Sequence, residues 1–196
     1  MGRASRQKLR APMAPLKLDF GCGPHKREGF NGVDAIAFPG VDFVVDLTKT
    51  PWPWDNNSVA EAHASHFIEH LTALQRVAFC NEIDRILVPG GKCSIVVPHW
   101  ASCRAYGDPT HQWPPVSEFW FYYLSREWRT ANAPHTDAEH LKGGFSCDLH
   151  VGWGYSLRDD VLVRAQEYQQ FAIQNYKEVC LDTLATLTKP DKAVSA

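Results

Sequence analysis

The amino-acid sequence predicts an α/β protein with a doubly wound, mostly parallel β-sheet. Short apolar runs that end in turn residues are followed by a segment with helical periodicity and then by a β-branched run. The second half differs, because residues 100–157 are rich in aromatics and prolines, while residues 159–188 return to a helical period. The predicted architecture is therefore a parallel sheet, an irregular aromatic-rich insertion and a long C-terminal helix.

The length and composition favour a single domain. The chain has 196 residues, of which 44% are hydrophobic and 21% are charged, and these values suit one core. No apolar run is long enough to span a bilayer, and the charged N-terminus lacks the apolar segment of a signal peptide. We expect a flexible basic leader over residues 1–15, one domain over residues 16–190, no membrane association and a cytoplasmic location.

The net charge of −2 gives no overall attraction for a phosphate backbone. The first 18 residues nevertheless carry five basic side chains and no acid, which fits either a solvated leader or an arm that contacts nucleic acid. We favour the leader, so nucleic acid is a possible partner that is not preferred. The six cysteines include no closely spaced pair, so we expect reduced thiols without a disulfide framework or a zinc cluster.

The first half of the chain is expected to form five strands and one helix. Turn residues separate the strands, including Pro39-Gly40 and Asp55–Asn57. Thr72 can cap the helix, and Pro89–Gly91 would end it. The expected strands cover residues 16–20, 30–35, 43–47, 59–65 and 92–98, and the helix covers residues 72–88.

The second half is interpreted as the substrate-binding part. A long irregular stretch such as residues 100–157 is usually functional in a compact domain, and the alternative is a satellite aromatic core. The C-terminal helix over residues 159–188 would begin at Asp159-Asp160 and end before Pro190. Its length would allow it either to lie along the sheet or to form a homodimer with a second copy.

Gly21 and Gly23 follow the first expected strand, where a backbone without Cβ atoms can turn sharply and approach a ligand. A phosphate-binding dinucleotide fingerprint would also require glycine at position 26, which is Lys26 here. This departure disfavours a nicotinamide-dependent oxidoreductase. Asp19, two residues before Gly21, instead suits a ligand that carries an amino group.

Two more acids stand at expected strand ends. Asp34 ends the second strand, where a carboxylate can accept hydrogen bonds from both hydroxyls of a ribose. Asp46 ends the third strand, in a position to meet an adenine amino group. Because ligands bind at the carboxyl ends of parallel strands, Asp19, Asp34 and Asp46 are expected to converge on one crevice.

The order of these motifs resembles that of class I S-adenosylmethionine-dependent methyltransferases, most of all their broad type 11 group. The likeness covers residues 16–99 and implies a Rossmann-like fold with S-adenosylmethionine as the cofactor. The motifs that carry it are Asp19–Gly23, Gly32–Asp34, Asp46-Leu47, His66–His70 and Arg85–Lys92.

The resemblance also implies which residues bind the cofactor. The connection over residues 24–29 is too short for the usual helix, so Lys26 or Arg27 is expected to hold the cofactor carboxylate. The expected contacts are Asp19, Gly21 and Gly23 at the methionine moiety, Asp34 at the ribose, and Asp46 and Leu47 at the adenine, with Cys22, Lys26 and Ser65 nearby.

Candidate catalytic residues follow the fourth and fifth strands. Methyl transfer from a sulfonium requires an aligned acceptor and sometimes the removal of a proton, which a histidine can accept near neutral pH. His66 and His111 are expected to align or deprotonate the acceptor, with Asp108 orienting it. Glu69 and His70 have a plainer alternative role, which is to cap and pack the following helix.

A metal ion is a further alternative, because some relatives pair an acid with a histidine in this way. Its ligands would be His66, Glu69 and His70 together with His99 or His111. Local spacing does not define this set, so we predict no metal.

The sequence therefore predicts a methyltransferase that moves a methyl group to oxygen or nitrogen of a small, possibly aromatic, acceptor. One alternative is an RNA or nucleotide methyltransferase that uses the basic leader as an electrostatic arm. Another is a non-catalytic cofactor-binding or structural partner with the same fold. Two classes of DNA-base methyltransferase are disfavoured, because Ser65–Ile68 stands where the Pro-Pro-aromatic motif would fall and no cysteine lies near that strand end.

Overall fold

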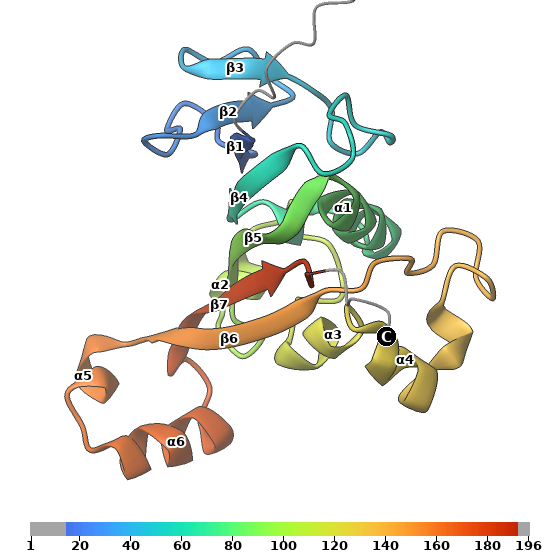
Figure 1. Cartoon of the computed structure of the whole chain (residues 1–196). Helices are drawn as coiled ribbons and strands as arrows, with labels where there is room; N and C mark the ends of the chain where they lie inside the picture. Colours follow the sequence, from blue (N-terminus) through green and yellow to red (C-terminus); the bar gives the residue numbers. More distant parts are fainter. Residues whose placement is uncertain (1–14, 192–196) are drawn as a thin grey trace, which may run out of the picture.

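A computed structural model describes residues 15–191, and its centre is one sheet of seven strands (Figure 1). The strands lie in the order β3-β2-β1-β4-β5-β7-β6. Pairing is parallel from β3 to β5, whereas β7 is antiparallel to both of its neighbours, β5 and β6. The strands are β1 (Leu16–Phe20), β2 (Asn31–Asp34), β3 (Val41–Val44), β4 (Val59–Ser65), β5 (Leu87–Pro98), β6 (His150–Leu157) and β7 (Cys180–Thr188).

The five strands predicted in the first half of the chain are present. β1 and β4 have the predicted bounds, β2 and β3 are shorter, and β5 begins earlier, at Leu87. The Pro-Gly-Gly segment that ends the helix therefore continues as a strand. Gly90 takes a positive φ of 73°, and its N–H donates to the carbonyl of Lys189 at 2.9 Å, which ties this segment to the end of β7.

The helix α1 (Ala73–Ile86) begins after Thr72, the cap that the sequence predicts, and the structure has a capping box there. The Thr72 hydroxyl accepts a hydrogen bond from the Gln75 N–H, and Gln75 Oε1 accepts one from the Thr72 N–H at 2.9 Å. Two backbone donors at the helix start are satisfied in this way. The helix lies beside β4 and β5 (Figure 1) and buries Phe79 and Ile83 in the main core.

Aromatic packing covers part of the sheet where no helix is present. Within residues 15–191, no helix connects β1 to β2, β2 to β3 or β3 to β4. The loop after β3 instead places Trp52 and Trp54 against Phe20 of β1. The ring centroid of Trp52 lies 5.0 Å from that of Phe20 and 5.3 Å from that of Phe79, so the loop joins the sheet to α1.

The aromatic-rich insertion is shorter than predicted, because β6 accounts for its last part. It leaves the sheet after β5 and contributes Phe121 and Leu124 to the main core. The segment therefore completes the domain as well as reaching the carboxyl ends of the strands. Its helices are α2 (Arg104–Gly107), α3 (Glu118–Tyr122), α4 (Arg126–Asn132) and the 3-10 helix η2 (Pro134–Thr136).

The prediction of a long C-terminal helix over residues 159–188 is wrong. The segment forms α5 (Asp159–Leu162), α6 (Gln166–Asn175) and then β7. The error has a geometric cause, because a spacing of four residues, as between Thr183 and Leu187, is close to one helical turn and also keeps one face of a strand. The homodimer, which was one of two alternatives for this helix, loses its basis, since the two short helices lie at the far end of β6 and β7 (Figure 1).

Other expectations concern the chain as a whole. Within the described residues, no helix combines the length and the apolar character that a bilayer crossing needs. Each of the six cysteines is a free thiol. The predicted basic leader lies outside the described residues, apart from its last position.

Candidate active site

Two adjoining cavities lie at the carboxyl ends of the parallel strands. One, of about 230 Å³, is lined by residues that follow β1 to β4, among them Asp34, Asp46 and His66. The other, of about 310 Å³, is lined by Asp19 and its neighbours. Gly21 lines both, so the three acids predicted to converge surround one cleft. We call the two cavities together the strand-end cleft.

The turn after β1 has a backbone that favours glycine. φ is +64° at Gly21 and +53° at Gly23, in the left-handed region that other residues rarely adopt. A Cβ atom on Gly21 would collide with the ring of Phe67, whereas a Cβ atom on Gly23 would meet no heavy atom within 4 Å. The backbone at Gly23 is thus open to an approaching molecule. Cys22 lies between the two glycines. Burial, together with the carboxylates of Asp19 and Asp34, raises the pKa of its thiol, which stays neutral.

Asp34 ends β2 and holds this turn in place. Its Oδ2 accepts a hydrogen bond from the Gly23 N–H at 2.9 Å, and its Oδ1 accepts one from the Ile36 N–H at 2.9 Å. Each carboxylate oxygen can accept a further hydrogen bond. The half-buried Asp34 is therefore anchored by the backbone and still able to bind two hydroxyl groups.

Asp46 and Leu47 form another part of the wall of the first cavity. Asp46 accepts hydrogen bonds from the N–H and the hydroxyl of Thr48, at 3.0 and 2.6 Å, and these bonds hold the pKa of its carboxyl below the ordinary value. The side chain of Leu47 is buried, and its carbonyl accepts a hydrogen bond from Trp52 Nε1 at 3.1 Å. The wall thus combines a fixed apolar side chain with an ionised carboxylate.

The second cavity brings a buried acid and two basic side chains together. Asp19 is 4% exposed, and its Oδ2 accepts a hydrogen bond from the Arg27 N–H at 2.8 Å. The Arg27 guanidinium lies 3.2 Å from His63 Nδ1, and since arginine only donates, His63 accepts there. Burial lowers the pKa of His63, which fits a neutral imidazole. Ser65 lines the same cavity.

Lys26 and Arg27, the two candidates for holding a cofactor carboxylate, have different positions. Arg27 lines the strand-end cleft. Lys26 lines neither cavity, and its Nζ lies 2.8 Å from Oδ2 of Asp42 on β3. Asp42 also accepts a hydrogen bond from the Gly32 N–H at 2.7 Å. The structure thus places Arg27 at the cleft and pairs Lys26 outside it.

His66 follows β4 and lines the first cavity. Its backbone is left-handed, with φ of +51°. Its Nδ1 lies 3.3 Å from Oε1 of Glu69, and its Nε2 lies 3.9 Å from Oδ1 of Asp182. These two carboxylates raise the pKa of His66, with Glu69 having the larger effect. Asp182 belongs to β7 and also pairs with Arg104 at 3.0 Å.

Arg76 is a site residue that sequence reasoning missed, because it reads as an ordinary polar position of the helix. It is 2% exposed and donates only to backbone carbonyls. Its acceptors after β4 are Ile68 and Glu69, and those in the insertion are Gln112 and Pro114. Arg76 therefore holds the two segments together at the edge of the cleft.

The insertion brings Asp108 and His111 next to Glu69 and His70. The rings of His70 and His111 lie 4.8 Å apart between centroids. Thr110 Oγ1 donates to Asp108 Oδ1 at 2.6 Å and lies 2.9 Å from His70 Nδ1. The bond from Thr110 lowers the pKa of Asp108. One ligand-type atom from each of Glu69, His70 and His111 lies within 4.8 Å of the others.

Two alternatives from the sequence can be compared with this arrangement. The carboxylate of Glu69 does not cap α1, because Thr72 and Gln75 provide the capping box. His99 does not join the histidine cluster, since its Nε2 lies 2.8 Å from Oε1 of Glu118.

Comparison with known proteins identifies the fold. No protein-family model and no curated protein matches the chain. A SAM-dependent methyltransferase from Archaeoglobus fulgidus superposes with a TM-score of 0.60 at 16% sequence identity, over 91% of this chain and 87% of that one. A second, from Methanosarcina mazei, superposes with a TM-score of 0.53 at 12% identity, over 92% of this chain and 95% of that one. The chain has a class I S-adenosylmethionine-dependent methyltransferase fold.

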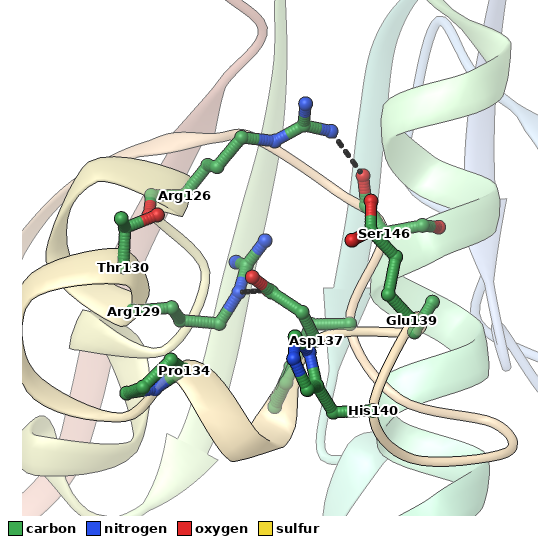
Figure 2. A pocket seen from close by; sticks show the side chains of 10 residues that line it. Arg126, Arg129, Thr130, Pro134, Asp137, Glu139, His140 and Ser146 are labelled. Carbon is green, nitrogen blue, oxygen red and sulfur yellow. Dashed lines mark hydrogen bonds and ion pairs between the residues drawn. The ribbon is translucent and has the colours of Figure 1, made fainter.

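This methyltransferase fold contains another cavity, of about 370 Å³, between α4 and the loop that follows it (Figure 2). Figure 2 shows that Arg126 donates a hydrogen bond to the carbonyl oxygen of Ser146 and that Arg129 forms an ion pair with Asp137. Arg129 is fully buried and also donates to the carbonyls of Tyr123 and Cys147, at 2.7 and 2.9 Å. None of the cofactor-binding or catalytic residues predicted from the sequence lines this cavity, so it is separate from the strand-end cleft.

Proposed function

We propose that the chain is an S-adenosylmethionine-dependent methyltransferase that acts on oxygen or nitrogen of a small, partly aromatic acceptor. The observation that carries the proposal is the strand-end cleft. There the left-handed turn at Gly21, the anchored carboxylate of Asp34 and the buried carboxylate of Asp19 line two cavities that share Gly21. The methyltransferase fold supports the same reading.

The first cavity suits the adenosine part of the cofactor. Asp34 would accept hydrogen bonds from the two ribose hydroxyls, because each of its oxygens keeps a free lone pair beside its backbone bond. Leu47 would pack against the adenine, and Asp46 would accept a hydrogen bond from the adenine amino group. Two acceptors and one apolar wall match the chemistry of a nucleoside.

The second cavity suits the amino-acid part. Asp19 would pair with the cofactor's amino group, and Arg27 with its carboxylate. Gly21, Cys22, Gly23 and Ser65 would border this part, while Lys26 stays with Asp42. When bound, S-adenosylmethionine supplies an electrophilic methyl group on a positively charged sulfur. The chain's task is then to orient the acceptor and exclude water.

The acceptor would bind beside His66 and the segment over residues 104–113. Tyr106 and Trp113 are 54% and 77% exposed, and their ring centroids lie 6.4 Å apart. Exposed aromatic rings next to polar groups favour a planar ligand. His66 and His111 would align the acceptor or take its proton, and Asp108 would fix the loop through Thr110.

A thermal-shift measurement with S-adenosylhomocysteine tests the proposal without knowledge of the acceptor. A ligand at one hundred times its Kd stabilises a protein by about 2.7 kcal/mol. For a chain of this length, each kcal/mol raises Tm by about 2–4 °C. We therefore expect Tm to rise by about 5–10 °C with S-adenosylhomocysteine or S-adenosylmethionine.

NAD is the matched control, because it shares the adenosine part and lacks the amino-acid part. We expect no shift with NAD, since the second cavity offers the buried carboxylate of Asp19 where NAD carries pyrophosphate. No shift with either sulfur compound, or an equal shift with NAD, would contradict the proposed cofactor.

A further inference from the structure

Glu69, His70 and His111 form a cluster beside the strand-end cleft that the cofactor contacts proposed above do not use. Glu69 and His70 lie in the 3-10 helix η1 (Ile68–His70), and His111 comes from the insertion. The loop and η1 are joined by the Gln112 N–H, which donates to the Glu69 carbonyl at 2.8 Å, and by Arg76. One potential ligand atom from each side chain lies within 4.8 Å of the other two.

The carboxylate of Glu69 is the first sign that a ligand belongs here. Glu69 is 4% exposed, yet neither of its oxygens has a hydrogen-bond partner within the described residues. The nearest basic atom is His66 Nδ1, 3.3 Å from Oε1. Arg76, although buried close by, gives its hydrogen bonds to backbone carbonyls. A buried carboxylate whose one ion-pair partner is the exposed imidazole of His66 is costly, and a bound cation would offset that cost.

The proton on His70 is the second sign. The hydroxyl of Thr110 donates its only proton to Asp108 Oδ1, because an ionised carboxylate can only accept. Thr110 Oγ1 must therefore accept from His70 Nδ1, at 2.9 Å. The proton of a neutral His70 is thereby held on Nδ1, and Nε2 keeps a lone pair. Metal-binding histidines are commonly fixed by an outer acceptor in this way.

His111 is oriented by the same principle. Its Nδ1 lies 3.3 Å from the carbonyl oxygen of Ala105, which can only accept a hydrogen bond. In a neutral His111, Nδ1 is therefore the protonated nitrogen, and Nε2, which lies 3.9 Å from Oδ2 of Asp108, keeps a lone pair. Two imidazoles and one buried carboxylate that lacks a hydrogen-bond partner thus offer ligand atoms within 4.8 Å of one another.

We propose that Glu69, His70 and His111 bind one divalent transition-metal ion. Two imidazoles and one carboxylate are a ligand set that suits Zn²⁺ and similar ions, and less well Mg²⁺, which prefers oxygen. Three protein ligands leave at least one coordination position open.

An open coordination position would lie near the proposed site of methyl transfer, because His70 lines the strand-end cleft together with His66 and Asp34. This part rests on the proposed function. An acceptor with an oxygen donor would complete the coordination of the metal, which would hold that oxygen in place and favour loss of its proton. Metal binding itself needs only the three side chains.

Titration calorimetry with Zn²⁺ tests the site directly. We expect the chelator-treated full chain to bind one Zn²⁺ with a Kd of about 1 µM or lower, equivalent to about 8 kcal/mol. Glu69→Gln should raise Kd by about 100-fold or more, since ligand loss exceeds the 10–100-fold effect of losing an outer partner. His111→Ala should do the same. Thr110→Val should raise Kd about 10-fold, because it frees the tautomer of His70.

His140→Ala is the matched control, since His140 is an exposed histidine of the separate cavity in Figure 2. It should bind Zn²⁺ like the wild type. Zn²⁺ should also raise the Tm of the wild type and not that of Glu69→Gln, whose fold is checked by circular dichroism. The site would be overturned if the wild type bound no Zn²⁺, or if Glu69→Gln and His111→Ala bound it unchanged.

The two proposals can fail separately. The Zn²⁺ titration is made without cofactor, and the S-adenosylhomocysteine shift is made in chelator. Zn²⁺ binding without a cofactor shift would support the metal site and contradict the methyltransferase proposal. A cofactor shift without Zn²⁺ binding would overturn the metal site alone.

Discussion

Replacing Asp34 with alanine is expected to raise the Kd for S-adenosylhomocysteine by at least about 100-fold in titration calorimetry. The variant loses the carboxylate that would bind both ribose hydroxyls, and each charge-assisted hydrogen bond contributes about 1.5–3 kcal/mol. It also frees the Gly23 N–H, which donates to Asp34 at 2.9 Å, so the turn around the cleft is less well held.

Asp42→Ala separates these two effects. Asp42 accepts a backbone hydrogen bond from Gly32 at 2.7 Å and pairs with Lys26, so its removal also costs the sheet a backbone contact and a charge. It lines neither cavity of the strand-end cleft. We expect the affinity of Asp42→Ala for S-adenosylhomocysteine to stay close to that of the wild type. An unchanged affinity in Asp34→Ala would remove Asp34 from the cofactor site.

Replacing Arg76 with alanine is expected to lower the free energy of unfolding by about 3–5 kcal/mol, the usual cost of breaking a buried charged network. The guanidinium donates to four carbonyl groups from two segments. Those of Ile68 and Glu69 keep a backbone donor, whereas those of Gln112 and Pro114 would lose theirs, at a cost of about 1–3 kcal/mol each. The variant would also remove one of the positive charges that act on the buried Glu69, although His66 would remain. Urea denaturation measures the loss.

Arg158→Ala is the control for this prediction. Arg158 is exposed, and its main partner is the exposed Asp160 at 2.5 Å. Exposed ion pairs contribute about 0–1 kcal/mol, so little change is expected. The loss of unfolding free energy in Arg76→Lys should lie between those of Arg76→Ala and Arg158→Ala, because one ammonium group cannot donate to four carbonyls. A loss below about 1 kcal/mol in Arg76→Ala would contradict its role as a link between η1 and the insertion.

The parallel half of the sheet was predictable because local signals agree there. The first three short apolar runs end beside a glycine or an acid, and such residues fit strand ends that face a ligand. Gly21 and Gly23 take the left-handed backbone that their residue type suggests. Thr72 lies three residues before Gln75, the spacing of a capping box. These elements could be predicted because the apolar runs, the turn residues and the helix cap all indicate the same structure.

The C-terminal segment was not predictable from its period. Thr183 and Leu187 repeat every four residues, which fits a helix and a strand alike. β7 forms because its backbone pairs with both β5 and β6, and this pairing depends on residues far away in sequence. For the same reason the sequence does not reveal Asp182 as a neighbour of His66, because the predicted helix includes Asp182, whereas the structure places it on β7.

The cluster around Glu69 was only partly predictable. The sequence places Glu69 next to His70, and it names His111 as a candidate, but their approach depends on the path of the insertion. That path is held by Arg76, whose burial nothing in the helical pattern reveals. Contacts between distant segments are where single-sequence reasoning is weakest.

The most direct test of the central claim is a crystal structure of the chain with S-adenosylhomocysteine. We expect the ribose hydroxyls at the carboxylate of Asp34, the adenine against Leu47 and the amino-acid end between Asp19 and Arg27. Electron density for the ligand in any other place would contradict the proposed cofactor site. So would a strand-end cleft without ligand density in crystals grown at a saturating ligand concentration.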